Sequence, residues 1–84
     1  METKYIIFKE EFGIITTGII FPKHIEHSHI SIRNHIPISA GFCQIFEKDA
    51  TLEIYCYGES ISLRLQSKKE IDSEILQNRL NSRY

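Results

Sequence analysis

Residues 38–58 read ISAGFCQIFEKDATLEIYCYG, two apolar runs on either side of a short polar turn. Isoleucine and aromatic residues favour strands. A short polar segment between two such runs is typical of a β-hairpin. We therefore expect antiparallel strands over 38–47 and 51–57. This pairing brings the glycine-containing ends of the two strands, around Gly41 and Gly58, to the same end of the sheet.

The rest of the chain shows more strand-like runs and two helical segments. The expected elements are strands over 4–9, 14–21, 38–47, 51–57 and 60–66, and helices over 23–34 and 68–81. Because strands outnumber helices and hairpins dominate, we expect an α+β fold. It consists of a small five-stranded, mostly antiparallel sheet with two helices, in the order ββαβββα. A chain of 84 residues is expected to be a single domain, 1–84.

Local signals support these boundaries. Pro22 fits the first turn of a helix, and Ser67 followed three residues later by Glu70 is the pattern of a capping box. Gly18 interrupts the second strand, which predicts a bulge there. In the fifth strand the alternation places three apolar side chains on the inward face, Ile61, Leu63 and Leu65.

Composition excludes several classes of protein. The net charge is -1 with histidine neutral, whereas a protein dedicated to duplex nucleic acid normally carries a basic stripe. No apolar run approaches the ~20 residues of a membrane span, and no secretory signal is visible, so we expect a cytoplasmic protein.

Cys43 and Cys56 lie in apolar runs, which favours two buried, reduced thiols. Because so small a domain is marginal alone, we expect a homo-oligomer.

The candidate ligand site is formed by the two glycine-containing segments. Glycine inside a strand-like run often marks a turn or a close approach to the backbone. The N–H groups of residues 39–41 are suited to an anion, and the Glu59 carboxylate is suited to the hydroxyls of a sugar. Phe42 or Tyr57 can stack on a base, and Arg64 can meet a phosphate. The expected ligand-binding residues are His27, Ser39, Ala40, Gly41, Phe42, Tyr57, Gly58, Glu59, Ser60 and Arg64.

The four histidines all lie within residues 24–35. On a helix, His24 and His27 are close enough to share a metal ion. No third ligand follows at zinc spacing, because the sequence has neither HExxH nor CxxC. A polar helix face is therefore the favoured interpretation. The sequence also shows no identifiable set of acid, base and nucleophile. We expect no catalytic residue, no metal and no cofactor.

Together these motifs resemble a family of short phage and prophage proteins. The residues that carry the resemblance are Ile20-Phe21-Pro22, His27, Ser39-Ala40-Gly41-Phe42, Cys56-Tyr57-Gly58-Glu59-Ser60, Ser62-Leu63, Leu65 and Ser67. The family pattern has one histidine in the first helix, matched here by His27. No reaction comes with the resemblance, and what it implies is a viral setting. Small viral proteins of this kind often counteract host defence, and some are oligomeric sponges for the nucleotide signals of bacterial immunity.

We therefore expect a homo-oligomeric phage-type protein that sequesters a small nucleotide-like ligand without catalysis, in an anti-defence role. The alternative is a protein–protein interaction module. In that case the glycine motifs are structural turns, and exposed Tyr55 and Tyr57 contact a host or viral protein. A third hypothesis is a small metal-dependent hydrolase that uses the histidines.

Overall fold

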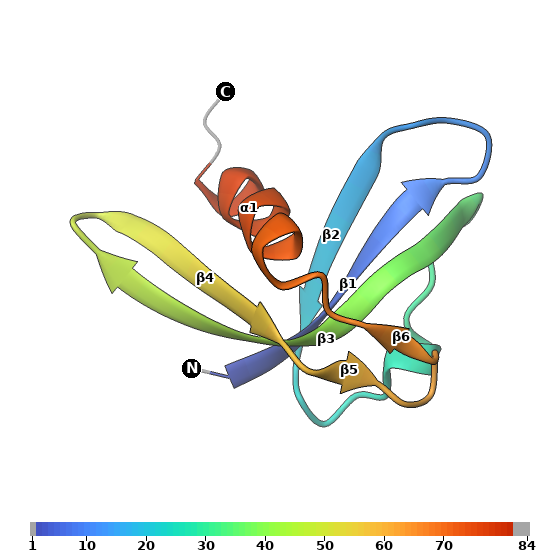
Figure 1. Cartoon of the computed structure of the whole chain (residues 1–84), viewed down its shortest axis with the longest axis horizontal. Coiled ribbons are helices and arrows are strands. Elements are labelled where there is room, and N and C mark those ends of the chain that lie inside the picture. Colours follow the sequence, from blue (N-terminus) through green and yellow to red (C-terminus); the bar gives the residue numbers. More distant parts are fainter. Residues whose placement is uncertain (1, 82–84) are drawn as a thin grey trace.

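The computed structural model describes residues 2–81 (Figure 1). Its elements are β1 (Glu2–Glu10), β2 (Thr16–Phe21), the 3₁₀ turn η1 (His27–His29), β3 (His35–Lys48), β4 (Thr51–Tyr57), β5 (Glu59–Ser60), β6 (Leu65–Gln66) and α1 (Lys69–Leu80). The larger sheet is antiparallel with the strand order β2-β1-β3-β4, and β5 and β6 form a separate two-stranded sheet. The expected five-stranded sheet with two helices is therefore wrong. The described chain is an α+β fold with one α-helix and a four-stranded plus a two-stranded sheet.

The long strand β3 determines the shape of the molecule. It pairs with β1 along its first part and with β4 along its second part. The β3–β4 hairpin and the β1–β2 hairpin consequently point apart, and α1 lies between them (Figure 1). α1 packs against both β4 and β2. The expected β3–β4 pairing is confirmed, with Phe42 opposite Tyr57 and Cys43 opposite Cys56.

The apolar run of β1, residues 5–8, is buried on both faces of the sheet, as expected for a strand covered on both sides. Alternate side chains enter two different cores. The core beneath α1 contains Tyr5, Ile7, Cys43, Ile54, Cys56 and Leu76, and the core on the opposite face contains Ile6, Phe8, Phe21 and Ala40. The sheet is thus the middle layer of the molecule.

Residues 23–34 do not form the expected helix. Apart from the single turn at His27–His29 the segment is irregular, and its isoleucines Ile25, Ile30 and Ile32 pack against the core opposite α1. Ile25 and Ile30 are five positions apart in the sequence, so they would not lie on one face of a helix. His29 is exposed. β-branched side chains also lose rotamer freedom in a helix, which lowers the helix propensity of this segment. The packing of its isoleucines against the core therefore determines its conformation.

The expected fifth strand over 60–66 is instead a hairpin, β5–β6, closed by a turn. The N–H of Arg64 donates to the carbonyl of Ile61 at 3.2 Å, and Arg64 has a φ of 56°. The hydroxyl of Ser60 accepts a hydrogen bond from the N–H of Leu63 at 3.2 Å. Such a side-chain bond to the local backbone competes with an extended strand. As a result Leu63 packs in the core, whereas Ile61 is 85% exposed.

α1 begins close to the expected position, but the capping box is wrong. The hydroxyl of Ser67 accepts a hydrogen bond from the N–H of Lys69 at 3.1 Å. The N–H of Lys68 donates not to a glutamate but to the carboxylate of Asp72, at 2.9 Å. Asp72, and not Glu70, is therefore the acidic side chain that accepts a backbone N–H at the start of α1. No helix within residues 2–81 has the length and apolarity needed to cross a membrane.

α1 also closes the outer edge of β4. The N–H groups of Leu52, Ile54 and Cys56 donate to Asn81 Oδ1, Gln77 Oε1 and Ser73 Oγ at 3.0, 2.9 and 2.9 Å, and Asn81 Nδ2 donates to the carbonyl of Leu52 at 2.9 Å. One polar stripe of the helix thus satisfies every second residue of the strand. Covering an edge in this way prevents further strand pairing.

Gly18 marks a close approach of the helix and not the expected bulge. β2 pairs with β1 without a register shift. A Cβ at Gly18 would collide with the side chain of Leu76, so α1 packs against β2 where the strand has no side chain. The irregularity in the sheet lies elsewhere, between β1 and β3 at Ile7 and Phe8.

Candidate functional site

A cavity of about 430 Å³ opens where β4 ends and the β5–β6 hairpin begins. We call it the Gly58 cavity, and it is lined by Lys4, Glu26, Phe42, Tyr57, Gly58, Glu59, Ile61 and Ser62. The lining comes from β1, β3, β4, the 22–34 segment and the hairpin. Its volume lies within the range of small-molecule sites, ~300–1,000 Å³.

The backbone around Gly58 fixes the cavity's shape. Gly58 has a φ of 78°, a conformation that glycine adopts without strain. Its carbonyl accepts a hydrogen bond from the N–H of Ser67 at 2.9 Å, and Glu59 pairs with Gln66 in the hairpin. These contacts anchor the hairpin to the start of α1. The residues of the cavity are therefore held on hydrogen-bonded elements.

One wall of the Gly58 cavity is aromatic. Phe42 and Tyr57 are cross-strand neighbours whose ring centroids lie 6.0 Å apart, with an interplanar angle of 25°. The polar groups are Lys4, Glu26, Glu59 and Ser62. Lys4 is held in place by a hydrogen bond from its Nζ to the carbonyl of Ile25 at 2.8 Å. The lining thus combines flat apolar surface with one cation, two carboxylates and a hydroxyl.

A second hollow of about 420 Å³ shares part of this backbone segment with the Gly58 cavity. It is lined by Gly58, Glu59, Gln66, Ser67 and Lys69. Gly58 and Glu59 line both spaces, so the two adjoin at these residues. Lys69 supplies the second hollow with a cation.

The structure brings only part of the expected ligand-binding set to this surface. Phe42, Tyr57, Gly58 and Glu59 line the cavity. His27, Ser39, Ala40, Gly41 and Ser60 are buried in the interior. Arg64 is exposed in the hairpin turn but does not line the cavity. The sequence did not indicate Lys4, Glu26, Ile61 or Ser62, because only the fold brings β1 and the 22–34 segment to the hairpin.

His27 is a packing residue beneath the cavity. It is 4% exposed and lies edge-on between the rings of Phe21 and Phe42, at centroid distances of 5.4 and 6.0 Å. Its Nε2 is 2.9 Å from the carbonyl oxygen of Gly41, so Nε2 carries the proton and donates. This bond ties the 22–34 segment to β3. Burial lowers the pKa of His27 below its usual value.

We expect His27 to make the fold sensitive to acid. Because the pKa of His27 is lower in the folded chain, the unfolded chain takes up a proton first as the pH falls through about 6.5. Stability is therefore complete at neutral pH, falls below that value, and levels off below the folded pKa. Nearby Lys4 and Glu26 act on this pKa in opposite directions. His27→Gln retains a donor for Gly41, and urea titrations between pH 7 and 5 should show a smaller loss of stability.

The exposed His24 provides the control for this experiment. His24→Gln should leave the acid-dependent loss unchanged. An equal loss of unfolding free energy in the wild type and in His27→Gln would contradict the assignment to His27.

A buried polar cluster, which we call the Asp72 network, lies between α1 and the sheet. Asp72 is 1% exposed and its carboxylate accepts hydrogen bonds from Tyr5 Oη at 2.5 Å and Ser39 Oγ at 2.8 Å. Ser67 Oγ lies 2.7 Å from Tyr5 Oη. Burial, together with the bond to Asp72, raises the pKa of Tyr5 well above its usual value, so Tyr5 remains a donor. Ser39, an expected ligand-binding residue, belongs to this network.

One signal in the sequence could have found this network. Asp72 lies three and four positions before Ile75 and Leu76, so a carboxylate occupies the inward stripe of the last helix. A charged residue in such a stripe needs buried partners. Its partners come from β1 and β3, which only the fold places there.

Cys43 and Cys56 are free and buried, as expected. Burial raises the pKa of Cys43, and it raises the pKa of Cys56 to about 11. Both thiols therefore stay protonated at neutral pH, which makes them poor nucleophiles.

The histidines do not assemble a metal centre with other side chains in the part of the chain that is described. Within residues 2–81, no three side chains of His, Cys, Asp or Glu are grouped closely enough to hold a metal ion. Comparison of the chain with protein-family models, with curated proteins and with solved structures gives no match.

Proposed function

We propose that this protein binds a small nucleotide-like ligand in the Gly58 cavity and retains it without chemical change. The observation that carries the proposal is the aromatic wall of the cavity, formed by Phe42 of the first glycine-containing segment and Tyr57 of the second, beside Gly58 and Glu59. A flat apolar wall beside a few convergent polar groups is the usual composition of a small-molecule site.

The chemistry of the lining supports this ligand class. The Phe42 and Tyr57 rings offer a surface for a planar base. Glu59 and Ser62 are suited to the hydroxyls of a ribose, and Lys4 to a single phosphate. Lys69 in the adjoining hollow offers a second cation to a ligand that extends past Gly58 and Glu59 into that hollow.

Retention without turnover is supported by the reactive groups in the lining. Neither a histidine nor a cysteine is among the residues that line the cavity. The lining has two carboxylates, Glu26 and Glu59, but no hydrogen bond within residues 2–81 joins either of them to Ser62, whose hydroxyl lies 3.5 Å from that of Ser60. Sequestration of a nucleotide signal is the form that an anti-defence role would take, and this role rests on the resemblance to short phage proteins.

We expect protein purified from bacteria under native conditions to release a nucleotide when it is denatured, as detected by mass spectrometry of the supernatant. Glu59→Gln replaces a charged acceptor with a neutral one, a difference worth about 1 kcal/mol. The variant should therefore bind the released nucleotide about fivefold more weakly in isothermal titration. Ser62→Ala should also weaken binding, and both residues are exposed, so the fold should be preserved.

Glu47→Gln is the matched control, because Glu47 is an exposed glutamate of the β3–β4 hairpin. It should bind like the wild type, as should His24→Ala and His29→Ala. The proposal fails if no nucleotide is released and none binds. Loss of binding in His24→Ala with no effect in Glu59→Gln would instead favour a histidine site.

A further inference from the structure

The two edges of the four-stranded sheet are treated differently. The β4 edge is covered by polar side chains of α1. No hydrogen bond from elsewhere in residues 2–81 reaches the outer side of β2. Because Glu10 N–H bonds to the carbonyl of Ile15 at 3.1 Å, the alternation of an antiparallel ladder turns the backbone of Thr16, Gly18 and Ile20 outward.

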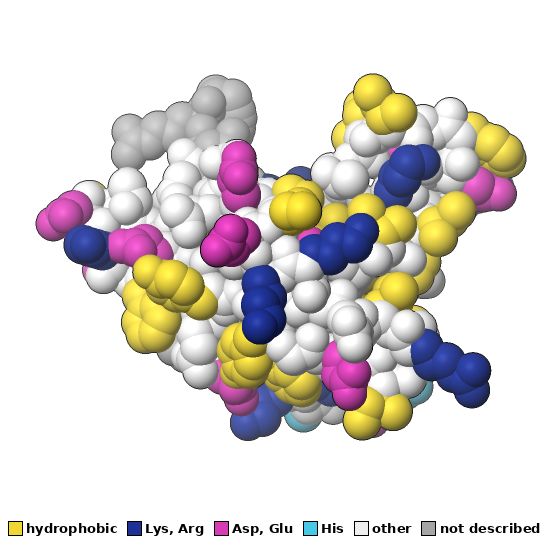
Figure 2. Space-filling model, in the orientation of Figure 1, with side chains coloured by type: hydrophobic (Ala, Val, Ile, Leu, Met, Phe, Trp, Pro, Cys, Tyr) yellow, Lys and Arg dark blue, Asp and Glu magenta, His cyan; other side chains and the backbone are white. Residues whose placement is uncertain are grey.

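The sequence of this edge lacks the usual protection against pairing. Residues 14–21 read IITTGIIF, with neither a charge nor a proline. Natural edge strands normally carry such residues, because an unprotected edge pairs with another strand. Ile14 is 89% exposed and Ile15 is 63% exposed. Figure 2 shows hydrophobic side chains gathered at the end of the β1–β2 hairpin.

We propose that the β2 edge pairs with the β2 edge of a second copy of this chain, antiparallel about a two-fold axis at Gly18. The two four-stranded sheets then form one continuous sheet. In this register the outward backbone N–H and C=O groups of Thr16 face those of Ile20 on the second copy. Exposed Ile15 lies opposite Phe21, and Ile14 lies opposite Pro22, where the strand ends.

Charge at the two ends of β2 favours a second copy over an unrelated strand. The same register places Lys23 of one copy opposite Gly13 of the other. The Glu10 carboxylate lies directly against Gly13, where a Cβ would collide with it. The side chain of Lys23 is 64% exposed and is available to a second carboxylate besides Glu2. Two-fold symmetry repeats this attraction at both ends of the paired strands.

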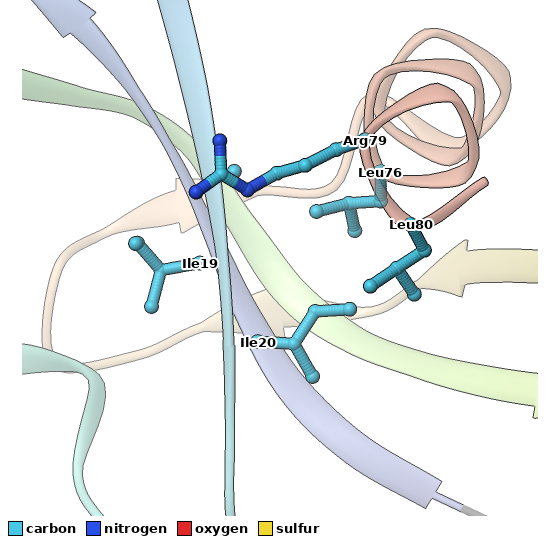
Figure 3. Close-up of a pocket in the computed structure, with 6 residues that line it drawn as sticks. Ile19, Ile20, Leu76, Arg79 and Leu80 are labelled. Atoms are coloured by element: carbon cyan, nitrogen blue, oxygen red, sulfur yellow. The ribbon is translucent and has the colours of Figure 1, made fainter. Parts of the chain in front are cut away.

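The space above the edge is open to a partner. A groove of about 250 Å³ lies between β2 and α1, lined by Gly18, Ile19, Ile20, Leu76, Arg79 and Leu80. In Figure 3 the side chains of Ile20, Leu76 and Leu80 converge on this space from the strand and the helix. The groove is apolar apart from Arg79, and side chains of a second β2 strand that stand on the α1 face of the sheet would lie against Ile20, Leu76 and Leu80.

The proposal predicts a dimer that specific variants disrupt. Light scattering at about 100 µM should give the mass of two chains. Ile15→Lys and Thr16→Lys place a charge on the edge and should weaken dimerisation at least about tenfold. Phe46→Lys is the control, because Phe46 is half exposed on the distant β3–β4 hairpin, and it should remain dimeric. A monomeric wild type would overturn the proposal, as would dimers that Phe46→Lys weakens and the β2 variants do not.

A charge exchange tests the register. Lys23→Glu and Glu10→Lys should each weaken their own homodimer through like charges at both ends. An equimolar mixture should recover dimers, because every end then joins opposite charges. Hydrogen exchange provides a second readout: the amides of Thr16 and Ile20, which are less buried than Gly18 in the single chain, should be protected in the dimer and exchange faster in Thr16→Lys. Unprotected amides at these positions in the wild type, or no recovery on mixing, would overturn the register.

Discussion

Replacement of Asp72 by alanine should lower the free energy of unfolding by roughly 3–5 kcal/mol. The change leaves Tyr5 Oη, Ser39 Oγ and the N–H of Lys68 without the acceptor that they share, and a buried donor that loses its partner is costly. For a chain of this size, 1 kcal/mol corresponds to about 4–8 °C in Tm. Thermal denaturation followed by circular dichroism should therefore show a decrease of at least about 12 °C.

Two further variants separate the network from a general effect on the helix. Tyr5→Phe removes one donor and should cost less than Asp72→Ala. Glu74→Ala removes an exposed carboxylate from the same helix and should change Tm little, because alanine is a good helix former. If Glu74→Ala were as destabilising as Asp72→Ala, the loss would belong to the helix and not to the buried network.

The part of the fold that could be predicted is the part decided by local pattern. The turn at residues 48–50 is short and polar, and the runs around it are strongly β-forming, so the β3–β4 register followed directly. The double-sided apolar run of β1 likewise indicated a central strand. In both cases the local preference and the tertiary environment agree.

The part that could not be predicted depends on contacts between distant segments. Residues 23–34 show helical spacing, but their isoleucines fill a core whose shape is determined by β1 and the β5–β6 hairpin. The alternation in 60–66 was misleading because Ser60 bonds to the N–H of Leu63 and starts a turn. Neither environment is visible in a window of a few residues.

The sequence predicted where on the sheet the candidate site lies, but it predicted only some of the residues that line it. The pairing of β3 with β4 brings Phe42 to Tyr57 and so places the aromatic wall. The glycine segments, however, differ in role. Gly58 lies at the cavity surface, while Gly41 is buried beneath it. A sequence motif alone does not distinguish a glycine that borders a ligand from one that lets two backbones approach.

Gly41→Ala should therefore destabilise the protein, contrary to the behaviour expected of a residue that only borders a ligand. A Cβ at this position would lie 2.5 Å from the carbonyl oxygen of Tyr57 and 3.3 Å from Cβ of Ser67. The first of these is backbone in a paired strand and cannot move without disturbing the β3–β4 ladder. Overpacking of this kind costs about 1–3 kcal/mol, and we expect about 2–3 kcal/mol in urea denaturation.

Gly13→Ala is the matched control, because a Cβ there meets only the flexible side chain of Glu10 and should cost well under 1 kcal/mol. The two glycine variants also report on the Gly58 cavity. Displacement of the Tyr57 backbone would shift one wall of the cavity, so Gly41→Ala should lose stability and nucleotide binding together, whereas Glu59→Gln should lose binding alone. A Gly41→Ala protein as stable as Gly13→Ala would show that β4 yields at Tyr57, and the rigid aromatic wall on which the binding proposal depends would have to be abandoned.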